Sequence, residues 1–134
     1  VGEAMRLPRV LADEDGDRFD PPDGLVLESG TYYVFEGSDV ATPFNGTTWD
    51  NFFHLAGDRD EIIIFNYAGF NVAKVEYDYY DWPLAYSQSM NLDPDHFNEV
   101  DNNYPTYWCY ATSVYSGYSS TDGGTPGSEN HECN

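Results

Sequence analysis

Four aspartates near the start of the sequence have the chemistry and the spacing of a metal-binding loop. Asp13, Asp15, Asp17 and Asp20 lie within eight residues, three of them at alternate positions. Carboxylate oxygens arranged in this way are the ligands that calcium prefers in proteins. The favoured interpretation is a hydrated acidic loop that holds no ion, so we expect no cofactor. The alternative is Ca2+ as the single candidate cofactor, bound loosely at extracellular concentrations.

The segment that contains these aspartates, DEDGDRFD at residues 13–20, resembles the D-x-D-x-D-G loops of EF-hand, dockerin and thrombospondin-type repeats. The resemblance covers eight residues and implies a calcium site. It differs from those loops at Arg18, where they have a glycine for a sharp turn, and no glutamate stands at the twelfth position. Both differences favour the hydrated loop.

Two cysteines and one glycan acceptor indicate the compartment. Cys109 and Cys133 are the only cysteines, and a disulfide between them would close a loop of about 25 residues, stabilising the fold by on the order of 3 kcal/mol. Asn45 begins an N-G-T acceptor for N-glycosylation. Disulfides persist in oxidising compartments, so we predict a secreted, extracellular glycoprotein. The alternative is a cytosolic protein with two free buried thiols.

The charge balance excludes several classes of partner. The chain has 24 acidic and 5 basic side chains, which gives a formal net charge of −19. Phosphate backbones and anionic membrane surfaces would repel it, so we expect no nucleic acid as partner. The longest apolar run, residues 62–65, is far shorter than the ~20 residues of a membrane-spanning helix, so we expect no membrane insertion. A cation or a basic protein is the natural counterpart.

Catalytic motifs are missing from the sequence. It contains no G-x-S-x-G elbow and no glycine-rich phosphate loop, and its three histidines, His54, His96 and His131, are scattered. With so many carboxylates, some pair will always lie at a separation suited to a glycosidase, so this signal carries little information. We therefore expect no catalytic residues and no enzymatic activity. A small secreted hydrolase is the third alternative for the function.

Aromatic side chains make up 17% of the residues and include twelve tyrosines and three tryptophans. Trp49, Trp82 and Trp108, together with the tyrosines of residues 77–80, could fill a core that is poor in leucine and isoleucine. They could also cover a subunit interface, where tyrosine and tryptophan are enriched. As a third alternative, they could form a platform that stacks on sugar rings.

The hydrophobic pattern predicts many short strands and almost no helix. The most regular segments are residues 61–67, which read as a central strand, and residues 70–80, which read as a half-buried strand with a charged outer face. A helical turn should begin at Asp93, with Pro94 at its first position. Further strands are expected at residues 25–27 and 31–35 (a hairpin), 42–44 and 47–49 (joined at Asn45-Gly46), 86–92 and 106–116.

The segment YWCYA at residues 107–111 resembles the Y-x-C strand of immunoglobulin-like domains, although the second cysteine here lies downstream. Together with the strand spacing, it favours an all-β fold, an antiparallel sandwich or jelly-roll of which the immunoglobulin-like arrangement is one form. We expect an N-terminal edge arm and acidic loop at residues 1–23, a β-sandwich domain at residues 24–118 and a disulfide-tethered tail at residues 119–134.

The N-terminal arm suggests a function in assembly. Met5, Leu7 and Val10 could add as a strand to the open sheet edge of the next subunit, while Pro8 confines the arm to an edge. Identical head-to-tail contacts of this kind generate filaments. We therefore expect a non-catalytic, self-assembling subunit of a fibre, a pilus-like filament, a coat or a surface layer. The alternatives are an arm that folds back on its own domain and a secreted carbohydrate-binding module with a glycan as partner.

Overall fold

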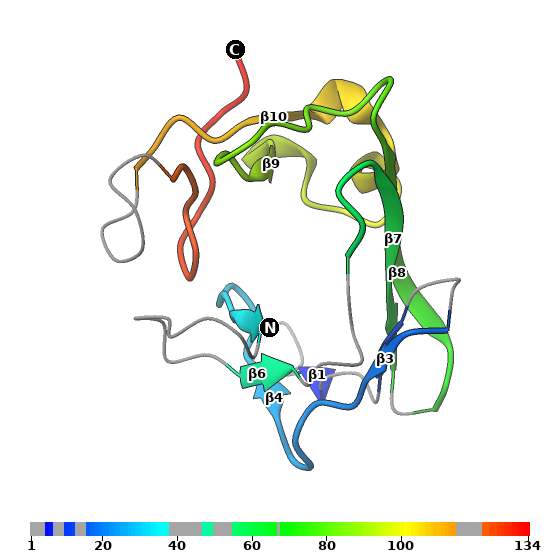
Figure 1. The fold of residues 1–134 in the computed structure, drawn as a ribbon. Coiled ribbons are helices and arrows are strands. Elements are labelled where there is room, and N and C mark those ends of the chain that lie inside the picture. The colour runs from blue at the N-terminus through cyan, green and yellow to red at the C-terminus, as the bar shows by residue number, and fades with distance from the viewer. Residues whose placement is uncertain are drawn as a thin grey trace.

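The computed structural model describes residues 5–6, 10–12, 16–37, 47–49, 55–66, 68–114 and 122–134 (Figure 1). Within these ranges the chain is built from short strands and single turns of 3-10 helix, and it has no α-helix. The prediction of an all-β protein is therefore confirmed at this level. No helix in the described ranges is both long enough and apolar enough to cross a membrane.

The largest sheet has four antiparallel strands in the order β3-β2-β7-β8. Its members are β2 (Val10–Ala12), β3 (Arg18–Phe19), β7 (Arg59–Phe65) and β8 (Asn71–Asp78). The apolar run of β7 lies between two neighbours, as predicted for a central strand. A tight turn joins β7 to β8, and there the Asn66 side chain accepts hydrogen bonds from two backbone N–H groups, those of Ala68 and Phe70, both at 3.0 Å.

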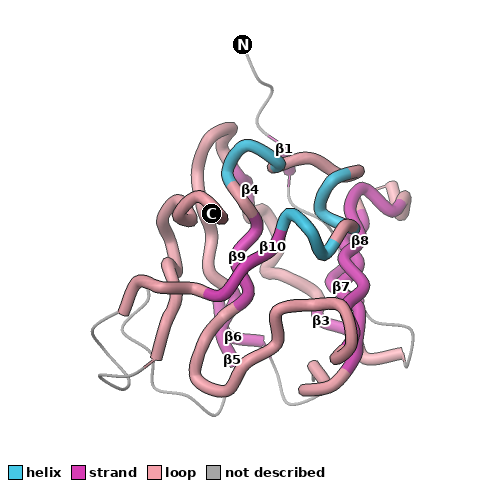
Figure 2. Tube along the Cα trace, turned by 90° about the horizontal axis from the view of Figure 1, so that it is seen from above, coloured by secondary structure: helices cyan, strands magenta, loops and turns pink. Residues whose placement is uncertain are grey.

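Among the described residues, three two-stranded sheets accompany the four-stranded one (Figure 2). β1 (Met5–Arg6) pairs antiparallel with β4 (Val26–Leu27), β5 (Phe35–Gly37) pairs parallel with β6 (Thr47–Trp49), and β9 (Met90–Leu92) pairs antiparallel with β10 (Trp108–Tyr110). The hairpin predicted between residues 25–27 and 31–35 is therefore wrong. The expected turn does form, with the N–H of Thr31 donating to the carbonyl of Glu28 at 3.1 Å, but the strands on its two sides pair elsewhere.

The described residues form two centres of apolar packing, and the long β7–β8 hairpin connects the regions that contain them (Figure 1). Near the N-terminal strands, Phe19 is 6% exposed and packs against Phe35, with the ring centroids 5.8 Å apart, and against Ile62 and Ile64 of β7. Beyond β8, Trp82 packs against Trp108 with a centroid distance of 5.4 Å. Large aromatic rings thus fill both centres, as expected for a chain poor in leucine.

The segment between β9 and β10 contains three 3-10 turns, η1 (Pro94–His96), η2 (Asp101–Asn103) and η3 (Pro105–Tyr107). The predicted turn at Asp93 is confirmed, because its side chain accepts a hydrogen bond from the N–H of Asp95 at 2.9 Å and Pro94 follows. The single long strand predicted at residues 106–116 is wrong. η3 takes up its start, and β10 has only three residues.

The C-terminal tail is held against β9 and β10 by several contacts. The predicted disulfide between Cys109 and Cys133 is confirmed. The Cys133 N–H also donates to the carboxylate of Asp93 at 2.9 Å, which ties the tail to the start of η1. Gly123 is buried and forms isolated β-bridges with Gln88 and Val114, so the tail is also held by backbone hydrogen bonds.

Candidate functional site

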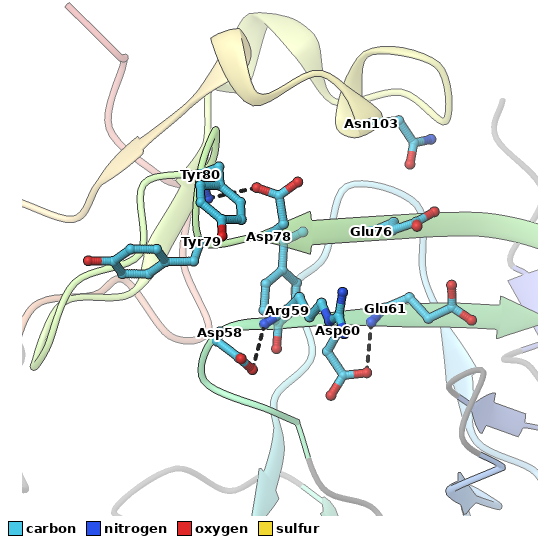
Figure 3. Close-up of a pocket in the computed structure, with 10 residues that line it drawn as sticks. Asp58, Arg59, Asp60, Glu61, Glu76, Asp78, Tyr79, Tyr80 and Asn103 are labelled. Carbon is cyan, nitrogen blue, oxygen red and sulfur yellow. Dashed lines mark hydrogen bonds between the residues drawn. The ribbon is translucent and has the colours of Figure 1, made fainter.

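An open groove of about 1140 Å3 lies beside the start of β7, the end of β8 and η2 (Figure 3). Most of its lining side chains are acidic or phenolic. They are Asp58, Arg59, Asp60, Glu61, Glu76, Tyr77, Asp78, Tyr79, Tyr80 and Asn103. Five carboxylates against one guanidinium make this part of the surface strongly negative, in line with the charge of the whole chain.

The pairing register of β7 and β8 determines which groove side chains lie together. Arg59 is opposite Asp78, and Glu61 is opposite Glu76. Directly opposite residues in an antiparallel pair point to the same face of the sheet, so these four charged side chains share one face. The sequence placed the charged residues of β8 on one face but gave no sign that β7 would add to them.

Glu61 is the buried carboxylate of the groove, with a side chain that is 3% exposed. Its Oε2 atom lies 2.5 Å from the Nζ atom of Lys74, the only lysine of the chain, and this ammonium is its sole partner among the described residues. Lys74 also contacts Glu76 at 3.2 Å. The hydrogen bond to Glu61, followed by that to Glu76, outweighs partial burial and raises the pKa of Lys74 above its ordinary value.

Tyr77 fixes the loop that leads into β7. Its ring is 6% exposed, and its hydroxyl donates to the backbone carbonyl of Ala56 at 2.6 Å. Burial, reinforced by the charges of Asp60 and Asp58, raises the pKa of Tyr77 to about 12. The carboxylate of Asp60 accepts from the N–H of Ala56 at 2.5 Å and from the N–H of Glu61 at 2.8 Å, so it ties the loop to the start of β7.

Tyr79 and Tyr80 stand at the rim of the groove, in the turn that follows β8 (Figure 3). They are 68% and 91% exposed, and their rings meet edge to face at a centroid distance of 6.2 Å. The Asp78 carboxylate accepts from the N–H groups of Tyr80 at 2.8 Å and Asp81 at 3.0 Å, which holds the turn. Trp82, buried just beyond, anchors this segment, so the two phenols are presented from a fixed backbone.

The arrangement suits an extended ligand better than a single metal ion. Among the residues that the structure describes, no group of three or more acidic, histidine or cysteine side chains converges as metal ligands would. The groove carboxylates are instead spread along β7 and β8, and the groove also has the amide of Asn103 and two phenols at its rim. Such a surface offers many hydrogen-bond acceptors, a few donors and flat rings.

The tryptophans considered for a sugar platform lie elsewhere. Trp82 is 8% exposed and Trp108 is half-buried, and their rings pack on each other. The Trp108 ring N–H also donates to the backbone carbonyl of Asn102 at 3.0 Å. These two rings therefore belong to the interior, because they supply the apolar contacts that the chain's few leucines do not. Trp49 lies in β6, and its side chain is outside the described part of the protein.

The predicted calcium loop is described only in part. Asp13 and Asp15 lie outside the described residues. The Asp20 carboxylate accepts two hydrogen bonds from the Arg18 guanidinium, at 2.9 and 3.1 Å. The arginine that replaces the expected glycine thus neutralises one of the proposed ligands, and calcium binding stays a prediction.

The residues of the predicted assembly arm and glycan site are also covered in part. Met5 lies in β1 and Val10 in β2, while Leu7 and Asn45 fall outside the described residues. Both described arm segments pair within their own chain. β1 pairs with β4, and β2 has β3 on one side and β7 on the other.

The described histidines make structural contacts. His96 stacks on Tyr107 with a centroid distance of 3.7 Å and pairs with the Asp101 carboxylate at 2.9 Å. His131 lies 2.9 Å from the side-chain nitrogen of Asn91, which is 2% exposed. These contacts hold η1 against η2 and the C-terminal tail against β9, and neither histidine lines the groove.

No family model, no curated protein and no solved structure matches this chain.

Proposed function

We propose that this protein is a non-catalytic extracellular binding module that holds a saccharide in the acidic groove. The observation that carries the proposal is the position of Tyr79 and Tyr80, two highly exposed rings at the rim of a groove whose walls are carboxylates. Tyrosine is enriched where proteins bind partners, because its ring supplies a large contact area and its hydroxyl a hydrogen bond.

The groove matches the chemistry of a sugar. The apolar C–H face of a sugar ring can stack on a phenol, which gives contact area at a small loss of side-chain entropy. Sugar hydroxyls can donate to the carboxylates of Asp58, Glu76 and Asp78, and they can accept from Arg59 or from the amide of Asn103. An open groove allows a longer chain of sugars to extend beyond it.

The state of the one buried carboxylate favours binding over hydrolysis. A glycosidase needs a carboxyl group that stays protonated in apolar surroundings and donates its proton to the leaving group. Glu61 is buried, but it is paired with the Lys74 ammonium 2.5 Å away and so does not stand alone in apolar surroundings. The remaining groove carboxylates are exposed or half-buried and in contact with water.

The wider setting of the proposal is a secreted β-module. The Cys109–Cys133 disulfide supports export to an oxidising compartment. We further propose that the described sheets belong to a sandwich or jelly-roll. The groove lies at the end of the β7–β8 hairpin where β7 begins and β8 ends.

Assembly through the N-terminal arm remains a second prediction. The pairing of β2 on both sides within its own sheet supports the arm that folds back on its own domain. Light scattering on the native protein separates the two. Polymers or closed shells would support assembly, and a monomer of about 15.1 kDa would support the binding module alone.

The saccharide proposal is tested on a glycan array, followed by calorimetric titration of the best ligand. Tyr79→Ala and Tyr80→Ala should each weaken binding about tenfold, that is by ~1.4 kcal/mol, as expected for the loss of one aromatic stacking contact. Tyr86→Ala is the matched control, because this tyrosine is 99% exposed but does not line the groove.

Two outcomes would contradict the proposal. One is that no saccharide on the array binds the natural protein, or that every saccharide that binds it binds equally well to a double variant with alanine at Tyr79 and Tyr80. The other is release of shorter sugars from the bound oligosaccharide, detected by chromatography, which would indicate a hydrolase.

A further inference from the structure

The turn after β8 presents phenol hydroxyls to solvent in an acidic setting. Tyr79 and Tyr80 are 68% and 91% exposed, and within the described parts of the chain neither hydroxyl makes a hydrogen bond. A phenol in this state is free to react with an enzyme that approaches from outside. The rigid turn set by Asp78 keeps both rings turned away from the core.

Carboxylates flank these two tyrosines on both sides. The sequence from residue 76 to residue 81 is EYDYYD, so Glu76 and Asp78 precede the pair and Asp81 follows it directly. Asp78 and Asp81 adjoin the tyrosine pair in the chain, and Glu76 adds a third carboxylate two residues before Asp78. Such a cluster attracts an enzyme whose substrate site is basic. The acidic residues thus serve as the recognition element and the hydroxyls as the reacting groups.

The disulfide indicates which group an enzyme would transfer. Cys109 and Cys133 are joined, which places the chain in an oxidising compartment. Kinases that phosphorylate tyrosine act chiefly in the reducing cytosol, whereas enzymes that transfer sulfate to tyrosine act on proteins in transit through the secretory route.

We propose that Tyr79 and Tyr80 are sites of tyrosine O-sulfation. In this step the phenolic oxygen attacks the sulfur of a 3′-phosphoadenosine 5′-phosphosulfate donor, and an O–S bond to tyrosine forms. The bond between sulfur and the oxygen of the donor's 5′-phosphate breaks, adenosine 3′,5′-bisphosphate leaves, and a base of the transferase takes the phenolic proton. No oxidant or reductant is needed.

Sulfation would change the groove without changing the fold. Each sulfate adds one negative charge that persists at physiological pH, placed at the rim beside five carboxylates. The exposed hydroxyls make no internal contact that the sulfate would break. A modified rim would select ligands or partners that carry positive charge, which goes beyond the saccharide binding proposed above.

Two other tyrosines of the chain serve as controls, because one has acidic neighbours without exposure and the other has exposure without acidic neighbours. Tyr77 lies between Glu76 and Asp78 but is 6% exposed, and its hydroxyl is hydrogen-bonded. Tyr86 is 99% exposed, but its nearest acidic residue, Asp81, is five positions away. A site recognised by both features should therefore react at Tyr79 and Tyr80 and at neither control.

The experiment incubates the native, disulfide-bonded protein with a purified tyrosyl-protein sulfotransferase and labelled 3′-phosphoadenosine 5′-phosphosulfate, and maps the label by peptide mass spectrometry. We expect label at Tyr79 or Tyr80 or both, little at Tyr86 and none at Tyr77. Asp81→Asn, which leaves the Asp78-bound turn intact, should reduce the initial rate several-fold.

In protein that has been reduced and unfolded, Tyr77 should become labelled at a rate comparable to that of its neighbours. Label on Tyr86 equal to that on Tyr80 would overturn the role of the carboxylates. Absence of label from both Tyr79 and Tyr80 in the native protein would overturn the proposal as a whole. Both results are independent of whether a saccharide binds.

Discussion

Replacing Lys74 with methionine removes the cation that neutralises Glu61. The Glu61 side chain is 3% exposed, and the Lys74 ammonium, 2.5 Å away, is the sole partner of its Oε2 atom among the described residues. Methionine keeps much of the apolar stem of lysine, so the packing around the strand should change little. The variant therefore isolates the cost of leaving a buried carboxylate without its counter-charge.

The magnitude follows from the burial of each partner. Breaking a buried ion pair by removing one side costs about 3–5 kcal/mol, because an uncompensated charge remains in the interior. The Lys74 side chain is 35% exposed, so water can partly replace it, and we expect the lower end, about 3 kcal/mol. Glu76, directly opposite Glu61 on β8, would then add repulsion between like charges.

The assay is urea unfolding at neutral pH with the disulfide intact, followed by tryptophan fluorescence. Lys74→Met should lower the free energy of unfolding by about 3 kcal/mol, and the double variant Glu61→Gln with Lys74→Met should recover most of the loss. Glu76→Gln is the matched control and should change stability by less than about 0.5 kcal/mol, because this carboxylate is exposed.

Two results would refute the reasoning. If Lys74→Met unfolds within about 0.5 kcal/mol of the natural protein, Glu61 is not held as a buried charge. If the double variant is no more stable than the single one, the loss comes from packing and not from the unpaired carboxylate.

Three further predictions concern other parts of the fold. Tyr77→Phe removes the hydrogen bond to the backbone of the loop before β7 and should lower the free energy of unfolding in urea by about 1 kcal/mol. In the natural protein, spectroscopic titration should show that the Tyr77 phenol ionises near pH 12. If all tyrosines ionise together near the ordinary pKa of tyrosine, this prediction is wrong. Hydrogen bonds from backbone N–H groups lower the pKa of Asp93 below its ordinary value of 3.8, and hydrogen bonds from side chains do the same for Asp101. The stability that these two ionised carboxylates contribute is therefore complete above pH 3.8 and is lost as the pH falls through their lowered pKa values. Asn at either position should flatten the acid limb of the stability curve, and an unchanged limb would count against the assignment. Gly123→Ala places a Cβ atom 2.8 Å from the carbonyl oxygen of Ala111, so it should loosen the C-terminal tail and speed amide exchange there, whereas Gly57→Ala, which meets open space, should not.

Local patterns in the sequence were sufficient for features that depend on neighbours along the chain. The alternation of residues 70–80 and the apolar run of residues 61–67 predict β7 and β8, because a strand exposes opposite faces at every second residue. The turn at Asp93 follows from a capping carboxylate and a proline that fits the first helical position. The disulfide follows from having only two cysteines.

Tertiary structure alone decided which strands pair and which rings are buried. The turn between residues 28 and 31 favours a local hairpin, but β4 pairs with β1 and β5 pairs with β6. The sequence does not reveal this pairing, because a strand's backbone can form hydrogen bonds with any other strand that tertiary packing brings alongside it. Trp82 and Tyr80 are both aromatic and two positions apart, yet one is 8% exposed and the other 91%. The groove depends on both outcomes: the register of β7 against β8 brings its carboxylates together, and the burial of Trp82 fixes the turn that presents its tyrosines.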